Sequence, residues 1–405
     1  MSSIHFEPSL AQTQRQSGRI QWVNIAKGIG IILVVFGHVG RGVIDRDNAT
    51  PKQGITATVS AIHQYVSLDN AMYAFHMALF FFLSGLFVER GATKSSVQFF
   101  GQKLRTIVYP YFIWSIIQSL FVALASAHVR GQISARDVIR KLPWETYAQF
   151  WFLYVLMLCM TVYWLFYKLR LGRTAITGIA LAIYLLGQRV HLSDHGKALA
   201  WLSEWSVLYQ TRMYFFYFAA GASCAPILLR PSKQLPAIVL TLAGAAMLIA
   251  EYWLAKDFDP EHIPAHLRAI GDFAIAHGLN ARDWVAILPA ALGIAGTLAI
   301  AMAIDQHRIG GLLEWLGELS LPIYVAQVIA AAAIRVALQK VLHIHQFGPH
   351  LILGTVAGLA VPVILDVFAL RVGFNYLFTF GATKSANKNK PGQIQPQIPA
   401  GIPVV

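Results

Sequence analysis

The stretch Asn24-IAKGIGIILVVFG-His38 decides the fold, because it is an apolar, membrane-spanning run that nevertheless contains a lysine and a histidine. Charged side chains are costly inside a bilayer, so an ionisable residue there indicates a functional site. Lys27 and His38 are eleven residues apart. On an α-helix they lie within about 20° of the same face and are separated by roughly 16 Å along the axis. We therefore expect one helix face to carry a cation near one membrane surface and an imidazole well toward the other.

The composition of the whole chain agrees with a membrane protein. Of the 405 residues, 56% are hydrophobic and only 13% are charged, whereas soluble domains carry about 25% charged residues. Apolar runs of about 17 to 25 residues are typical of membrane-spanning helices. We count ten such runs, at residues 24–42, 70–89, 106–127, 148–167, 174–190, 206–228, 234–255, 284–304, 316–340 and 351–379. The fold class predicted is all-α, a polytopic bundle of about ten transmembrane helices.

The chain is expected to form a single integral membrane domain over residues 21–381. Residues 1–20 are polar and show no cleavage site, so we predict a cytoplasmic N-terminal segment that is retained. Residues 382–405 are rich in Pro, Gly, Asn and Lys, a composition typical of a disordered tail. An even number of spans puts both termini on one side, and the short basic loops favour the cytoplasmic side. The expected location is the inner (plasma) membrane, with several passes and both termini cytoplasmic.

Charge and cysteine content exclude several classes of partner. The formal net charge is +13, but the basic residues stand in short loops and no groove-reading motif appears, so nucleic acid is not an expected partner. Cys159 and Cys224 both lie within apolar runs, which indicates buried hydrophobic residues rather than a disulfide framework or a zinc site. His191 and His195, and His343, His345 and His350, have spacings that could bind a metal. No metal is expected, because no nearby acidic or cysteine residues complete such a site.

A second histidine stands in the next run, Phe75-His76-MALFFFL-Ser84-Gly85. We expect His76 to share its depth in the outer half of the bundle with His38. Two imidazoles with a pKa near neutrality could position a hydroxyl and accept its proton. The alternative for His76 is a hydrogen-bonded interior residue, and Ser84-Gly85 indicates close helix packing more than a nucleophile.

Basic residues collect between the second and third runs, among them Lys103 and Arg105. They could simply satisfy the excess of cations on the cytoplasmic side. Lys27 opens onto the same surface, however, and basic side chains pair strongly with phosphate oxygens. Lys27, Lys103 and Arg105 therefore either bind phosphate or only satisfy the excess of cations on the cytoplasmic side.

Three further side chains are candidates for contact with a substrate. Tyr324 and Gln327 are three residues apart and share a helix face, so they either line a cavity or form hydrogen bonds between helices. Trp151 could stack on a sugar, although aromatic residues at the ends of spans commonly form an interfacial belt.

Five segments resemble the integral-membrane acyltransferase family three, and within it the branch similar to fucose 4-O-acetylase. The first two, KGIGIILVVFGH and FHMALFFFLSGLF, are specific. The others are the basic stretch leading to YPYFIWS, the sequence Trp151-Phe152-Leu153, and Leu319-SLPIYVAQ. The resemblance implies a ten-span enzyme that moves an acyl group, usually acetyl, from cytoplasmic acetyl-CoA to a hydroxyl of an envelope carbohydrate or exopolysaccharide.

The resemblance also implies roles for particular residues. His38 matches the histidine held to be essential, Lys27 matches the basic member of the pair, and His76 matches the second-span histidine. The chain departs from many relatives at Asn24, where they have Asp, and at Gln327, where they have His. The first departure removes a possible counter-charge for Lys27, and the second argues against an imidazole in the ninth span.

Together these residues predict an arrangement for acyl transfer. Lys27, Lys103 and Arg105 would hold the phosphates of acetyl-CoA, and His38 would deprotonate the acceptor hydroxyl while His76 orients it or stabilises charge. A covalent acyl-histidine intermediate is the other possibility. The residues expected to contact substrate are Asn24, Trp151, Tyr324 and Gln327. A transporter using Lys27 and His38 as a proton or ion relay is the alternative function, but no repeated halves are visible.

Overall fold

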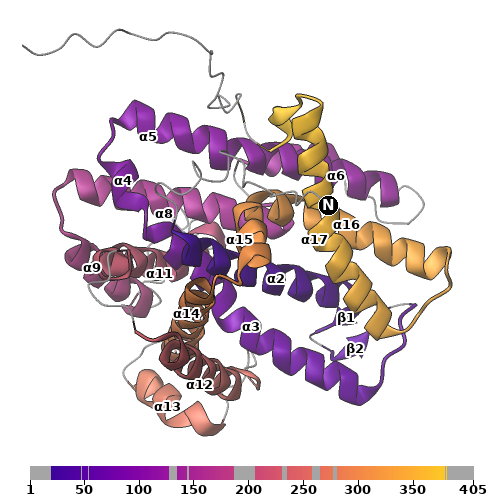
Figure 1. Cartoon of the computed structure of the whole chain (residues 1–405), viewed down its shortest axis with the longest axis horizontal. Coiled ribbons are helices and arrows are strands. Elements are labelled where there is room, and N and C mark those ends of the chain that lie inside the picture. The colour runs from indigo at the N-terminus through magenta and orange to yellow at the C-terminus, as the bar shows by residue number, and fades with distance from the viewer. Residues whose placement is uncertain are drawn as a thin grey trace, which may run out of the picture.

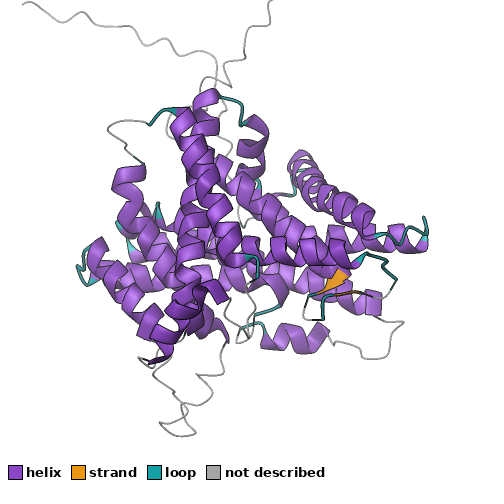
Figure 2. Cartoon of the chain, turned by 90° about the horizontal axis from the view of Figure 1, so that it is seen from below, coloured by secondary structure: helices purple, strands orange, loops and turns teal. Residues whose placement is uncertain are grey.

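The computed structural model describes residues 20–46, 48–52, 54–126, 135–143, 146–186, 206–229, 235–257, 265–276, 281–378 and 380. The helices in this part of the chain are α2 (Gln21–Val43), α3 (Val59–Gly85), α4 (Val88–Ala92), α5 (Ser96–Lys103), α6 (Tyr109–Ser126), α7 (Ala135–Lys141), α8 (Trp151–Lys168), α9 (Arg173–Leu186), α11 (Ser206–Leu228), α12 (Ala237–Ala255), α13 (Arg268–Ala276), α14 (Ala281–His307), α15 (Gly311–Glu318), α16 (Ser320–Lys340) and α17 (Phe347–Arg371). A hairpin of β1 (Ile44–Asp45) and β2 (Thr50–Pro51) follows α2 at the edge of the bundle (Figures 1 and 2). The predicted N-terminal segment and tail lie outside the described residues, except for residue 20.

The prediction of an all-α polytopic membrane protein is confirmed. Eight helical segments in the described part of the chain are long and apolar enough to cross a membrane. All ten predicted runs fall on helices, but two do not meet these criteria. Helix α9 has 14 residues, about 21 Å of rise, against a hydrocarbon core of about 30 Å. Helix α11 has 23 residues, but Gln210, Thr211 and Arg212 interrupt its apolar sequence.

The second run begins earlier than predicted. We expected its start near residue 70, but α3 starts at Val59, after Thr58, whose hydroxyl accepts a hydrogen bond from the backbone N–H of Ala61 at 3.2 Å. A side-chain oxygen at this position satisfies a donor that the first turn leaves open. The first turns of α3 are polar, so a search for apolar runs did not detect this extension. Ile62 and Tyr65 in these turns are nevertheless buried against the hairpin end of the bundle. The segment between the first two predicted runs, residues 43–69, is therefore helical from Val59 onward.

Helix α2 lies at the centre of the molecule (Figure 1). It packs against α3, α14, α15, α16 and α17, and buried residues occur all around its circumference. A helix that is apolar on all faces is one enclosed by other helices. The polar side chains of the opening motif are therefore held in the interior of the bundle.

The ninth run was wrongly predicted as a single helix over 316–340. The chain instead forms the short α15, breaks at Leu319, and continues as α16. Helix α15 packs backbone to backbone on α2: a Cβ added to Gly28 would strike the carbonyl oxygen of Leu313, and one added to Gly317 would strike that of Asn24. This contact requires glycine on both helices.

A second close contact joins α3 to α11. A Cβ at Gly85 would meet the carbonyl oxygen of Phe218, and a Cβ at Gly221 would meet that of Phe82. Small residues let membrane helices approach in this way. The packing role inferred for Gly85 is confirmed.

Candidate active site

A cavity of about 190 Å³ lies between α2, α3, α8, α16 and the π-helix η2 (Leu104–Val108), and its lining is mainly apolar. Helix α2 contributes Lys27, Ile31 and Val34, which recur at three- and four-residue spacing along one face. The full lining is Lys27, Ile31, Val34, Met77, Phe80, Ser84, Thr106, Ile107, Phe152, Leu153, Leu156, Ser320, Leu321 and Tyr324. The cavity thus follows the face of α2 on which the sequence places Lys27 and His38.

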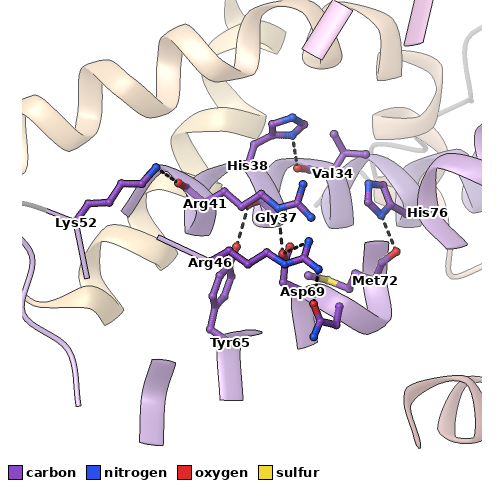
Figure 3. Close-up of polar contacts among 11 residues, drawn as sticks. Val34, Gly37, His38, Arg41, Arg46, Lys52, Tyr65, Asp69, Met72 and His76 are labelled. Atoms are coloured by element: carbon purple, nitrogen blue, oxygen red, sulfur yellow. Dashed lines mark hydrogen bonds and ion pairs between the residues drawn. The ribbon is translucent and has the colours of Figure 1, made fainter. Parts of the chain in front are cut away.

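His38 stands one turn beyond the cavity on the same face. Its Nδ1 lies 2.8 Å from the carbonyl oxygen of Val34, a residue of the cavity wall (Figure 3). A carbonyl can only accept a hydrogen bond, so Nδ1 carries the proton and donates it. In the neutral ring the lone pair is then on Nε2. This is the tautomer that leaves the outer nitrogen able to accept a proton.

Gln327 of α16 contacts the same imidazole: its amide nitrogen, Nε2, lies 3.1 Å from Nδ1 of His38. In this orientation the amide oxygen of Gln327 is buried without a hydrogen-bond partner. Because Nδ1 already carries a proton, turning the amide over, which exchanges its nitrogen and oxygen, lets the oxygen accept a hydrogen bond from Nδ1–H. Gln327 and Val34 together fix the ring of His38 from two helices.

His76 repeats the arrangement on α3. It is 6% exposed, and its Nδ1 lies 2.6 Å from the carbonyl oxygen of Met72, so Nε2 is again the nitrogen with the lone pair. The ring packs edge-on against Tyr73, with centroids 5.3 Å apart. Figure 3 shows His38 and His76 in one close-up, and their shared depth in the bundle stays a prediction. The alternative considered for His76 was a hydrogen-bonded interior residue. Its Nδ1 is hydrogen-bonded in this way, while the lone pair of Nε2 can still accept a hydrogen bond or a proton.

Lys103 and Arg105 do not line the cavity. They flank the start of the π-helix η2 (Leu104–Val108), which joins α5 to α6. Two residues of this segment, Thr106 and Ile107, line the cavity. Lys103 is half-buried with its ammonium over the ring of Phe99, while Arg105 is exposed. The structure therefore brings the backbone of the basic segment to the cavity that Lys27 also lines.

The remaining predicted site residues separate into two groups. Tyr324 lines the cavity and also donates a hydrogen bond to the backbone carbonyl of Gln149, so both roles considered for it occur together. Trp151 packs against Phe152 and Tyr214 beside the cavity rather than in its wall. Asn24 lies where α2 meets α15. Direct substrate contact by Trp151 and Asn24 remains a prediction.

The sequence reasoning missed an ionic cluster next to the histidines. Arg41 donates from Nε to Asp69 at 3.0 Å, and Arg46 lies 3.6 Å from the same carboxylate. The guanidinium of Arg41 also sits over the ring of Tyr73, 4.0 Å from its centroid. The signal was present in the spacing, since Arg41 is one turn from His38 and Asp69 is two turns from His76.

Among the described residues, no group of three histidine, cysteine, aspartate or glutamate side chains could hold a metal ion. In a comparison with known protein families, the model of a family described as "Acyltransferase domain" matches residues 20–367. Neither a curated protein nor a solved structure matches the chain. The matched region contains every residue of the cavity, both histidines and the ionic cluster.

Proposed function

The chain belongs to acyltransferase family three, and from this premise we propose that it is an O-acetyltransferase that carries an acetyl group from cytoplasmic acetyl-CoA to a carbohydrate hydroxyl on the other side of the membrane. Its membership and its helices make it a multi-pass membrane acyltransferase. The acetyl donor, the carbohydrate acceptor and the inner membrane are our proposals. The placement of the chain in the branch similar to fucose 4-O-acetylase is also a proposal.

The observation that carries the proposal is the continuity between the cavity and His38. The cavity wall includes Lys27 at one end and Val34 at the other, and Val34 holds the imidazole of His38. The rise from Lys27 to His38 is roughly 16 Å, a length of the order that a pantetheine arm spans. A thioester held with its phosphates at Lys27 would therefore extend through apolar surroundings to the histidine.

The proposed donor site consists of Lys27 with Lys103 and Arg105. Phosphate oxygens form charge-assisted hydrogen bonds with lysine and arginine, which are about twice as strong as neutral ones. The basic residues stand beside the π-helix whose residues Thr106 and Ile107 line the cavity. Charge at the cavity end and an apolar wall beyond it suit a ligand with an anionic head and an uncharged arm.

The proposed chemistry centres on Nε2 of His38. This nitrogen takes the proton from the acceptor hydroxyl while the hydroxyl oxygen forms a bond to the thioester carbonyl carbon. The carbon–sulfur bond then breaks, and the CoA thiolate receives the proton. The general base role suits the Nδ1–H tautomer that Val34 and Gln327 enforce, and Nε2 of His76 is the second group that could orient the hydroxyl.

We predict that Lys27→Glu raises the KM for acetyl-CoA on the order of tenfold or more, because it replaces a charge-assisted contact with repulsion. The KM for the glycan should change little. The control is Lys168→Glu, a charge reversal at an exposed lysine that lies over Trp164 and outside the cavity. Equal effects of the two substitutions on the KM for acetyl-CoA would contradict the donor site.

We predict that Gln327→Leu lowers kcat by roughly 10- to 100-fold, since misplacement of a catalytic group by about an ångström has effects of this size. The KM for acetyl-CoA should stay close to that of the wild type. Gln339→Leu is the matched control on the same helix, because Gln339 contacts the carbonyl of Gly54 and not the histidine. A loss confined to KM would show that Gln327 does not position His38.

The function itself is tested with sealed membrane vesicles and external [¹⁴C]acetyl-CoA, which does not cross a bilayer. Inside-out vesicles from cells that overproduce the protein should release CoA and acquire labelled glycan. Right-side-out vesicles should do neither until they are permeabilised. CoA release only in right-side-out vesicles would invert the orientation, and no release in any preparation supplied with the cell's own glycan would refute the acetyltransferase.

A further inference from the structure

We propose that the ionic cluster of Arg41, Arg46 and Asp69 binds an anionic group of the acceptor, a carboxylate or a phosphate. This inference rests on the proposed function, because it assigns the acceptor to the side of His38 opposite the donor cavity. It goes beyond that function by naming the charge of the acceptor.

The cluster continues the seam between α2 and α3 beyond the histidines. On α2, Val34, His38 and Arg41 follow one another at helical spacing, and Arg41 is about 4.5 Å of rise beyond His38. On α3, Asp69, Tyr73 and His76 share a face in the same way. Figure 3 shows Arg41, Arg46 and Asp69 together beside the two histidines. A group bound at Arg41 would therefore lie about one sugar ring from Nε2 of His38.

The charges in the cluster do not balance. Asp69 is the shared carboxylate of two guanidinium groups, at 3.0 Å from Arg41 and 3.6 Å from Arg46. The second contact of Arg46 is the neutral amide oxygen of Asn70, at 2.6 Å. One carboxylate thus faces two cations, which leaves an excess positive charge at the seam.

Two further cations lie at the outer end of α2. Lys52 from the hairpin donates to the backbone carbonyl of Arg41 at 2.7 Å, and Arg335 of α16 donates to that of Gly42. These cations stabilise the C-terminal end of α2, where the helix dipole is negative. Four cationic side chains of the described residues, Arg41, Arg46, Lys52 and Arg335, therefore gather at this end of the helix.

Arg41 has donor capacity that the protein does not use. Its Nε is bonded to Asp69 and its flat face is covered by Tyr73, but Nη2 is buried without a hydrogen-bond partner. Unsatisfied buried donors are rare and costly. The side chains of Arg41 and Arg46 keep 29% and 24% of their surface exposed, against 2% for Asp69. Guanidinium groups presented in this way match the paired oxygens of a carboxylate or phosphate.

The test uses the purified full-length protein in nanodiscs and the envelope glycan of the host cell in three forms: native, carboxyl-reduced to primary alcohols, and dephosphorylated with hydrofluoric acid. Binding of each glycan and acetyl transfer to it are measured separately. We expect the native glycan to bind on the order of tenfold or more tightly than one neutralised form, because charge-assisted contacts are lost. Loss on carboxyl reduction assigns a uronic acid, and loss on dephosphorylation assigns a phosphate.

The variants locate the effect in the cluster. Arg41→Gln should raise the Kd and the acceptor KM for the native glycan on the order of tenfold, without changing the KM for acetyl-CoA or the binding of the neutralised glycan. Arg46→Gln should show the same pattern with a smaller effect, and it carries the test if Arg41→Gln does not elute as a single folded species. Lys340→Gln, at an exposed lysine ending α16, is the control for general charge.

Equal binding of all three glycan forms, or equal effects of Arg41→Gln on native and neutralised glycan, would overturn the proposal. Acetyl transfer without any dependence on glycan charge would refute the anion site alone. Charge-dependent binding that Arg41→Gln abolishes, without acetyl transfer to any glycan, would refute the proposed function and retain the anion site.

Discussion

His38→Ala is expected to lower acetyl transfer by at least about 10²-fold, the usual cost of removing a general base. The protein should still fold and insert, because the ring bonds mainly to its own helix at Val34 and leaves no charged partner behind. The measurement is CoA release by purified protein with saturating acetyl-CoA. His76→Ala should also lower turnover, by a smaller factor, since it orients the hydroxyl.

The control for this experiment is His63→Ala, at an exposed histidine near the start of α3. It should transfer acetyl groups at the wild-type rate. Activity of His38→Ala within about threefold of the wild type would remove His38 from the mechanism. Both variants must show the elution profile and thermal midpoint of the wild type, so that a loss of activity reports chemistry and not unfolding.

Gly85→Val is expected to have the largest effect on stability. The new side chain would strike the backbone carbonyl of Phe218, and a backbone atom cannot rotate away as a side chain can. Overpacking of a core usually costs about 1–3 kcal/mol, and a clash with backbone should reach or exceed the upper end. We expect a marked loss of folded protein, measured as the thermal midpoint and the size-exclusion yield in detergent.

The same substitution at Gly178 provides the matched control. No atom lies within 4 Å of the position that a Cβ would occupy at Gly178 on α9, so Gly178→Val should leave the thermal midpoint unchanged or raise it, because glycine is the poorer helix former. Equal midpoints for the two variants would show that α3 and α11 do not depend on their glycine contact.

Much of the fold could be predicted because a membrane helix must satisfy its own backbone and be apolar, and both properties are local. The ten apolar runs therefore fall on helices. The predicted helix boundaries were wrong in two situations: where part of a helix is polar, and where an apolar run contains a break between two helices. The first turns of α3 are polar but helical, and the break at Leu319, which places Pro322 in the first turn of α16, lies inside a run that is apolar on both sides of it.

Only the part of the candidate site that lies on a single helix could be predicted from the sequence. The shared face of Lys27 and His38 follows from helical geometry alone. The contact of Gln327 with His38 joins residues 289 apart in the chain. The spacing of residues along one helix does not predict a contact between two helices. Arg41 and Asp69 could have been predicted from the sequence, because each shares a helix face with a histidine of the candidate site.

The central position of α2 has a consequence for the order in which the protein is made. Synthesis proceeds at about 5–20 residues per second, so between about 15 and 60 s separate the emergence of His38 from that of Gln327. During this interval α2 is in the membrane without α15, α16 and α17, the helices that later enclose it. The ring of His38 gains its second support only when nearly the whole chain exists. Assembly of the site is thus a late event in biogenesis, and a ribosome that stops before α16 leaves a nascent chain with spans but without catalytic competence.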